Sequence, residues 1–99
     1  MFVVRDIMYC KPGQVRPMVQ KFVALSKLIE KLGFGPMRIM TDVSAERYWT
    51  VVAEINVPSL EEYAKMSRES MALKEFQDAM SGYHDLIDNG RREIYQLEA

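Results

Sequence analysis

The order of two kinds of apolar periodicity along the chain restricts its fold more than any other feature. Four segments are expected to be strands. Residues 2–10 and 48–57 are rich in β-branched and aromatic residues, 36–42 is a short segment that follows Gly35, and the apolar residues of 91–97 roughly alternate. Two further segments carry apolar residues at helical spacing, 14–32 and 60–80. The chain therefore predicts the order strand, helix, strand, strand, helix, strand.

The boundaries of the first helix follow from Pro17 and Gly33. Proline lacks a backbone N–H and fits a helix only in the first turn, where that N–H would have no partner. Glycine readily adopts the left-handed conformation that ends many helices. We therefore expect this helix to begin near Val15 and to end before Gly33.

The second helix has a well-defined start and an irregular middle. Residues 59–62 form a capping box, in which the Ser59 hydroxyl accepts the Glu62 N–H and the Glu62 carboxylate reaches back to the Ser59 N–H. The phase of the apolar residues slips around 67–70, which predicts a kink or a break into two pieces. The pair Asn89-Gly90 is typical of a turn and is expected to precede the last strand.

This order of elements predicts one α+β domain, residues 1–99, with a ferredoxin-like βαββαβ fold. Right-handed crossovers place both helices on one face of a four-stranded antiparallel sheet. On the third strand, one alternating set is wholly apolar and suits the helix-covered face: Trp49, Val51, Ala53 and Ile55. Trp49 is accordingly expected in the core.

The other sheet face remains bare, and its composition is mixed. The side chains expected there come from the first and third strands: Val3, Arg5, Ile7, Tyr9, Tyr48, Thr50, Val52, Glu54 and Asn56. Such a face is too apolar for water and too polar for a plain core, which favours a cavity between two facing sheets. We therefore expect a homodimer that covers this face.

Composition excludes several classes of protein. The net charge is −1, and the only basic cluster, Arg91-Arg92, is too small for a nucleic-acid interface. No stretch approaches the roughly 18 apolar residues that would span a membrane. A lone Cys10 forms no internal disulfide, and Arg5 and Asp6 interrupt the only apolar N-terminal run, so no signal peptide is indicated. We expect a reduced, cytoplasmic protein without nucleic-acid or membrane partners.

Three motifs, in this order and spacing, resemble a known family. They are Lys11-Pro12-Gly13 after the first strand, residues 58–63 (Pro-Ser-Leu-Glu-Glu-Tyr) at the start of the second helix, and residues 90–95 (Gly-Arg-Arg-Glu-Ile-Tyr) leading into the last strand. Together they resemble the dimeric α/β-barrel superfamily, most closely the NIPSNAP-like proteins and more distantly the proteins similar to antibiotic-biosynthesis monooxygenases. The resemblance spans nearly the whole chain.

The resemblance implies two ferredoxin-like protomers that pair sheet to sheet around a central cavity. Relatives in this superfamily include cofactor-independent monooxygenases, haem-degrading enzymes and proteins without an assigned activity, and the fold alone does not choose among them. The Asn, Trp and His constellation of the haem-degrading members is not matched here, because Trp49 falls in a predicted strand.

His84 is the only histidine, so any imidazole acid–base chemistry near neutral pH must use it. The alternative is a structural role at a helix end, through the helix dipole or the neighbouring Asp85. Ser81, His84 and Asp85 contain the elements of a catalytic triad, but three groups within five residues do not surround a reacting carbonyl.

The bare face supplies the other candidates. Arg5 and Tyr9 are candidate catalytic residues with His84, because they can stabilise an oxygen anion without a metal. Tyr48, Thr50 and Glu54 are candidate ligand-binding residues. The alternative is that Arg5 and Glu54 simply pair with each other.

Metal and nucleotide sites are not indicated. One histidine and one cysteine on distant segments offer no zinc-type spacing. Gly33 and Gly35 precede Pro36 and no helix start, so they form no phosphate-binding loop. We therefore expect no cofactor and one of two functions. The first is a cofactor-independent monooxygenase or isomerase of a small aromatic or polyketide-like substrate. The second is a non-catalytic dimeric module that binds a small apolar or aromatic ligand or serves as an interaction module.

Overall fold

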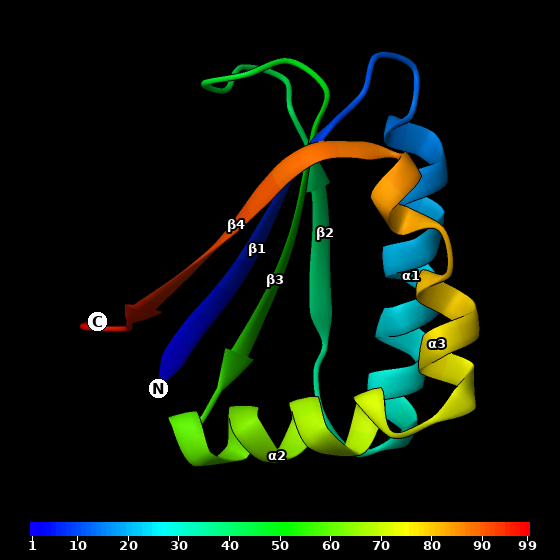
Figure 1. The fold of residues 1–99 in the computed structure, drawn as a ribbon. Coiled ribbons are helices and arrows are strands. Elements are labelled where there is room, and N and C mark those ends of the chain that lie inside the picture. The colour runs from blue at the N-terminus through cyan, green and yellow to red at the C-terminus, as the bar shows by residue number, and fades with distance from the viewer.

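The strands of the protein form a single antiparallel sheet in the computed structural model, which describes residues 1–99 (Figure 1). The strands are β1 (Phe2–Cys10), β2 (Met37–Thr41), β3 (Thr50–Val57) and β4 (Ile87–Gln96), in the spatial order β2-β3-β1-β4. Phe2 at the start of β1 pairs with Val57 on one side and Gln96 on the other, so both termini lie at the same end of the sheet. The predicted ferredoxin-like βαββαβ arrangement is confirmed.

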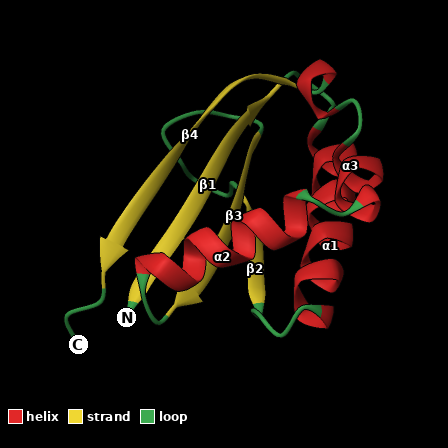
Figure 2. Ribbon diagram, turned by 60° about the horizontal axis from the view of Figure 1, so that its bottom comes forward, coloured by secondary structure: helices red, strands yellow, loops and turns green.

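The helices all lie on one face of this sheet (Figure 2). They are α1 (Val15–Lys31), α2 (Leu60–Met71) and α3 (Lys74–Met80), followed by the short 3₁₀ helix η1 (Tyr83–Asp85). Helices α1 and α3 run side by side, and α2 crosses the end of the sheet near the N-terminus (Figures 1 and 2). None of these helices is both long enough and apolar enough to cross a membrane.

The predicted starts of both helices and the end of the first are confirmed. Helix α1 begins at Val15 with Pro17 in its first turn, and Gly33 follows it with φ +89°. The Ser59 hydroxyl caps α2 by accepting the Glu62 backbone N–H at 3.1 Å. The second helical segment does break into two pieces, at 72–73 rather than 67–70, because Leu73 has an extended backbone with ψ 138°.

The core lies between the sheet and the helices, in two clusters. One contains Val4, Ile29, Ile55, Val57 and Met66, and the other contains Cys10, Met18, Phe22, Val51 and Ala53. Every second residue of β1 and β3 enters this layer, as the period of a strand requires. The predicted helix-covered set on β3 is confirmed for Val51, Ala53 and Ile55.

The prediction for Trp49 is wrong. This residue precedes β3, has φ +62° and is 44% exposed, so it belongs to neither the strand nor the core. Asp42 and Thr50 close the loop between β2 and β3, because the Thr50 N–H donates to Asp42 Oδ1 at 2.9 Å and the Asp42 N–H donates to the Thr50 carbonyl at 3.2 Å. The chain before Thr50 therefore turns out of the sheet.

The predicted turn at Asn89-Gly90 is also wrong, because both residues lie inside β4 and pair with Tyr9 and Met8 of β1. Gly90 is required there for space. A Cβ at this position would lie 2.8 Å from the Met8 Sδ and 2.9 Å from the Ile7 carbonyl oxygen. The chain reverses earlier instead, at Gly82 with φ +78° and the following η1.

Candidate functional site

The sheet face opposite the helices is dominated by one buried carboxylate. Glu54 is 8% exposed. Its Oε1 accepts hydrogen bonds from Arg5 Nε at 2.9 Å and Nη2 at 2.7 Å, and its Oε2 accepts the same pair of bonds from Arg38 at the same distances. Each arginine thus binds one oxygen through two nitrogens. Arg5 and Glu54 therefore pair with each other, as the second of the two interpretations from sequence stated.

These hydrogen bonds determine the ionisation of Glu54. They lower its pKa below the usual value, Arg5 having the largest effect and Arg38 the next, against an opposing effect of burial. The same bond to Glu54 raises the pKa of Arg5. Because both oxygens of Glu54 are already paired with cations, this carboxylate is ionised and remains bound to Arg5 and Arg38. It is poorly placed to accept a proton from a ligand.

Tyr9 and Thr50 lie on the same face under the loop between β2 and β3. The Tyr9 side chain is buried, and two guanidinium groups lie near its ring: Arg47 Cζ is 4.4 Å from the ring centre and Arg91 Cζ is 5.9 Å from it. The Thr50 hydroxyl donates to the Arg47 carbonyl at 2.8 Å. Arg5, Tyr9, Thr50 and Glu54 thus share one shallow hollow of about 410 Å³.

The other two predicted site residues lie apart from this group. Tyr48 lies in the loop between β2 and β3, is 86% exposed, and lines a separate hollow with Trp49. His84 is exposed in η1, with its ring centre 4.0 Å from that of Tyr83. The structure therefore does not bring His84 together with Arg5 and Tyr9.

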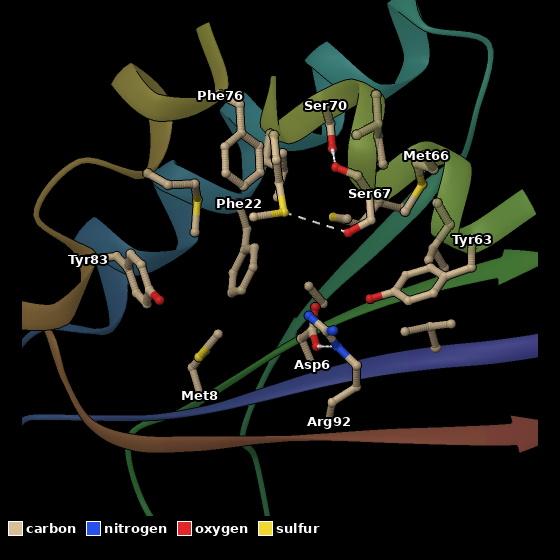
Figure 3. Close-up of a pocket in the computed structure, with 18 residues that line it drawn as sticks. Asp6, Met8, Phe22, Tyr63, Met66, Ser67, Ser70, Phe76, Tyr83 and Arg92 are labelled. Carbon is tan, nitrogen blue, oxygen red and sulfur yellow. Dashed lines mark hydrogen bonds and ion pairs between the residues drawn. The ribbon is translucent and has the colours of Figure 1, made fainter. Parts of the chain in front are cut away.

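A second, more enclosed cavity lies on the helix-covered face, between the sheet and all three helices (Figure 3). Its volume is about 380 Å³, and 14 of its 18 lining residues are hydrophobic. Five methionines contribute to the lining: Met8, Met37, Met66, Met71 and Met80. Methionine side chains are flexible and polarisable, so such a wall adapts to the shape of an apolar ligand.

One end of this cavity is polar. Asp6 of β1 lies opposite Arg92 of β4 in the strand register, and Arg92 Nε donates to Asp6 Oδ1 at 2.6 Å. Tyr63 of α2 approaches from above, with its ring centre 5.5 Å from Arg92 Cζ and its hydroxyl pointing into the cavity (Figure 3). Three groups able to bind a ligand oxygen therefore meet at one end of an apolar space.

The ionisation states at this polar end follow from the same contacts. Burial raises the pKa of Tyr63; the Arg92 charge opposes this rise and the Asp6 charge adds to it. The hydrogen bond to Asp6 raises the pKa of Arg92. Tyr63 is thus a neutral phenol and Arg92 a cation at neutral pH, so both are hydrogen-bond donors.

Reading the sequence missed this site. The alternation of β1 places Asp6 on the same face as Val4 and Met8, as one charge within an otherwise apolar set. This isolated charge could have pointed to a polar site on the helix-covered face. The sequence could not identify Arg92 as the partner of Asp6, because the two residues face each other only in the register that β4 adopts. No cluster of three or more His, Cys, Asp or Glu side chains suited to a metal is present in the structure.

Comparison with known proteins identifies the fold. The chain matches no protein-family model and no curated protein. Among solved structures it is similar to a NIPSNAP-like domain protein from Burkholderia xenovorans, with TM-score 0.82 and 18% identity over 99% of this chain and 85% of that one. A NIPSNAP family protein from Agrobacterium tumefaciens has TM-score 0.82 and 13% identity, over 98% of this chain and 92% of that one.

A more distant similarity is to a putative antibiotic biosynthesis monooxygenase from Nitrosomonas europaea, with TM-score 0.76 and 11% identity over the full length of both chains. At these identities the comparisons establish a shared fold. The resemblance seen in the sequence motifs is therefore confirmed as a likeness of fold to NIPSNAP-like proteins and, at lower similarity, to proteins of the monooxygenase type.

Proposed function

We propose that this protein binds a small, largely apolar molecule in the cavity between the sheet and the helices. The observation that carries the proposal is a largely apolar space of about 380 Å³ whose only charged groups, Asp6 and Arg92, lie together with Tyr63 nearby. Small-molecule sites in proteins typically combine an apolar wall with a few placed polar groups that orient the ligand. The hollow on the bare face is shallower and mostly polar, and both oxygens of its Glu54 are already bound by arginines.

Filling the cavity tests this proposal. Ser67 of α2 lines the cavity, whereas Glu69 lies on the exposed side of the same helix. We expect Ser67→Phe to weaken the binding of an apolar probe such as naphthalene at least tenfold by occupying its space, and Glu69→Phe to leave binding unchanged. Isothermal titration calorimetry measures both. Equal binding by the two variants would place the ligand elsewhere.

A cofactor-independent monooxygenase is the second candidate. The fold shared with a putative antibiotic biosynthesis monooxygenase favours it, as do the Asp6 carboxylate and the hydrogen-bond donors Tyr63 and Arg92 in the cavity. Asp6 would accept a proton from an acidic ring methylene that is conjugated with a ketone through an aromatic ring. The resulting carbanion would add dioxygen, and the peroxide anion would take the proton back from Asp6 to give a hydroperoxide. Loss of water from the hydroperoxide leaves a new carbonyl, so the methylene carbon supplies all four electrons that reduce dioxygen.

Oxygen uptake with anthrone, a ring ketone of this type, tests the second candidate. We expect uptake above the protein-free rate, a product with one added oxygen atom, and a loss of at least tenfold in Arg92→Met. Tyr9→Phe and His84→Ala serve as comparisons and should retain turnover, because neither residue lines the cavity. A rate equal to the protein-free control would exclude monooxygenase activity on that substrate class. The proposed ligand-binding function would be unaffected.

A further inference from the structure

From the unused hydrogen-bonding groups of Asp6 and Arg92, we infer that the cavity selects neutral ligands bearing a carbonyl or hydroxyl oxygen over ligands bearing a carboxylate. The inference rests on the proposed binding function and names the class of ligand. It follows from three properties of the polar end of the cavity: its free donors, its position and its net charge.

The ion pair leaves most of its hydrogen-bonding capacity free. A guanidinium has five N–H donors, and Arg92 uses its Nε to bind Asp6 Oδ1. Neither Nη group of Arg92 donates to a protein acceptor, and Asp6 Oδ2 accepts from no protein donor. A ligand oxygen therefore meets free N–H groups, with a free carboxylate oxygen beside them for a ligand hydroxyl.

The position of these groups suits a ligand that carries a polar group at one end of an apolar body. The Arg92 guanidinium rises from β4 toward α2 beside Asp6, and the Tyr63 hydroxyl points toward the same region (Figure 3). The side chain of Arg92 is 53% exposed and that of Asp6 is 24% exposed. The pair therefore lies where the cavity meets solvent, so a ligand can enter without breaking it.

The charge of the lining decides between a neutral and an anionic ligand. Asp6 and Arg92 are the only charged side chains among the 18 lining residues, so the lining carries no net charge. A carboxylate placed there would add an unbalanced negative charge next to Asp6, which repels it. A carbonyl or phenolic oxygen accepts the Arg92 N–H bonds without that cost.

Three probes with the same ring system test the inference at pH 7: naphthalene, 2-naphthol and 2-naphthoate. We expect 2-naphthol to bind the unmodified protein about ten- to a hundredfold more tightly than naphthalene, as hydrogen bonds to charged groups typically allow. We expect 2-naphthoate to bind more weakly than 2-naphthol. Calorimetric titration of the full chain gives all three dissociation constants.

Two variants and a control assign the preference to the ion pair. Arg92→Met should reduce the advantage of 2-naphthol over naphthalene to less than threefold, and Arg68→Met, an exposed arginine of α2 outside the cavity, should leave it unchanged. Asp6→Asn makes the lining net positive and should raise the affinity for 2-naphthoate relative to 2-naphthol at least tenfold. A merely structural role for Asp6 would not produce that change in relative affinity.

The outcomes separate this inference from the function on which it rests. Tightest binding of 2-naphthoate by the unmodified protein, or equal binding of naphthalene and 2-naphthol, overturns the inference while the cavity remains a binding site. Failure of all three probes to bind overturns both. If a variant does not fold by circular dichroism, the ranking of the three probes on the unmodified protein still decides.

Discussion

Single residues on the bare face show how a charge is kept inside a mostly apolar environment. Glu54 is buried because two arginines supply four hydrogen bonds to its two oxygens. Arg5 and Arg38 remain partly exposed, so the long side chains shield the carboxylate while their own charges reach water. The sequence left two roles open for Arg5 and Glu54, a pair with each other or a ligand site, and the structure shows the pair. The second arginine, Arg38, was not predicted from sequence.

The lowered pKa of Glu54 predicts how stability depends on pH. A carboxylate whose pKa is lower in the folded state stabilises the protein above its unfolded pKa of about 4.3, and this contribution is lost as pH falls through the folded pKa. Urea denaturation followed by circular dichroism should therefore show stability falling below about pH 4. Glu54→Gln should flatten this fall and cost about 1–2 kcal/mol at pH 7.

Glu69→Gln is the matched control, because Glu69 is exposed on α2, lies outside its first turn and forms no ion pair in the structure. Its stability should follow that of the unmodified protein at every pH. Parallel curves for Glu54→Gln and the unmodified protein would contradict the assigned role of Glu54.

At the scale of elements, the helices were predicted better than the last strand. A capping serine and a first-turn proline act within a few residues, so local chemistry sets both helix starts. Asn89-Gly90 has the local chemistry of a turn, yet it lies inside β4 because pairing with β1 overrides that preference. Gly90 is needed there for close approach to Met8 and not for a reversal of the chain.

The close approach at Gly90 predicts a cost for any side chain. Gly90→Ala would press a methyl group against the Ile7 carbonyl and Met8, and should destabilise the fold by about 1–3 kcal/mol. Asp88→Ala, an exposed position in the same strand, should stay within about 0.5 kcal/mol of the unmodified protein. Thermal and urea unfolding compare the two. A Gly90→Ala protein as stable as the original would mean that β4 moves away from β1 at little cost.

At the scale of the whole molecule, one sheet face has no helices over it. Met40 and Tyr95 are exposed there beside the charged pairs of Arg5, Arg38 and Glu54. The loop between β2 and β3 extends to the same side, away from the helices, and carries the exposed Tyr48 (Figure 1). We propose that a second copy covers this face, as the mixed composition of the strands led us to expect.

Sedimentation equilibrium at micromolar concentration tests the homodimer. We expect a particle with twice the 11.5 kDa mass of the chain. Met40→Glu adds an unpaired charge to the bare face and should shift the protein toward monomer, because an uncompensated charge is costly to bury in an interface. Leu60→Glu, at an exposed apolar position at the start of α2 on the other side, should not. A monomeric unmodified protein would refute the proposal.

The sequence by itself determined the order of elements, the starts of both long helices and the separation of β1 and β3 into two faces. Each of these depends on neighbours a few residues apart. Only the tertiary structure decided which face carries the enclosed cavity, because Asp6 and Arg92 are 86 residues apart in the chain and meet only through strand register. Likewise, Trp49 and Gly90 take their places from loop closure and strand pairing, which no local pattern specifies.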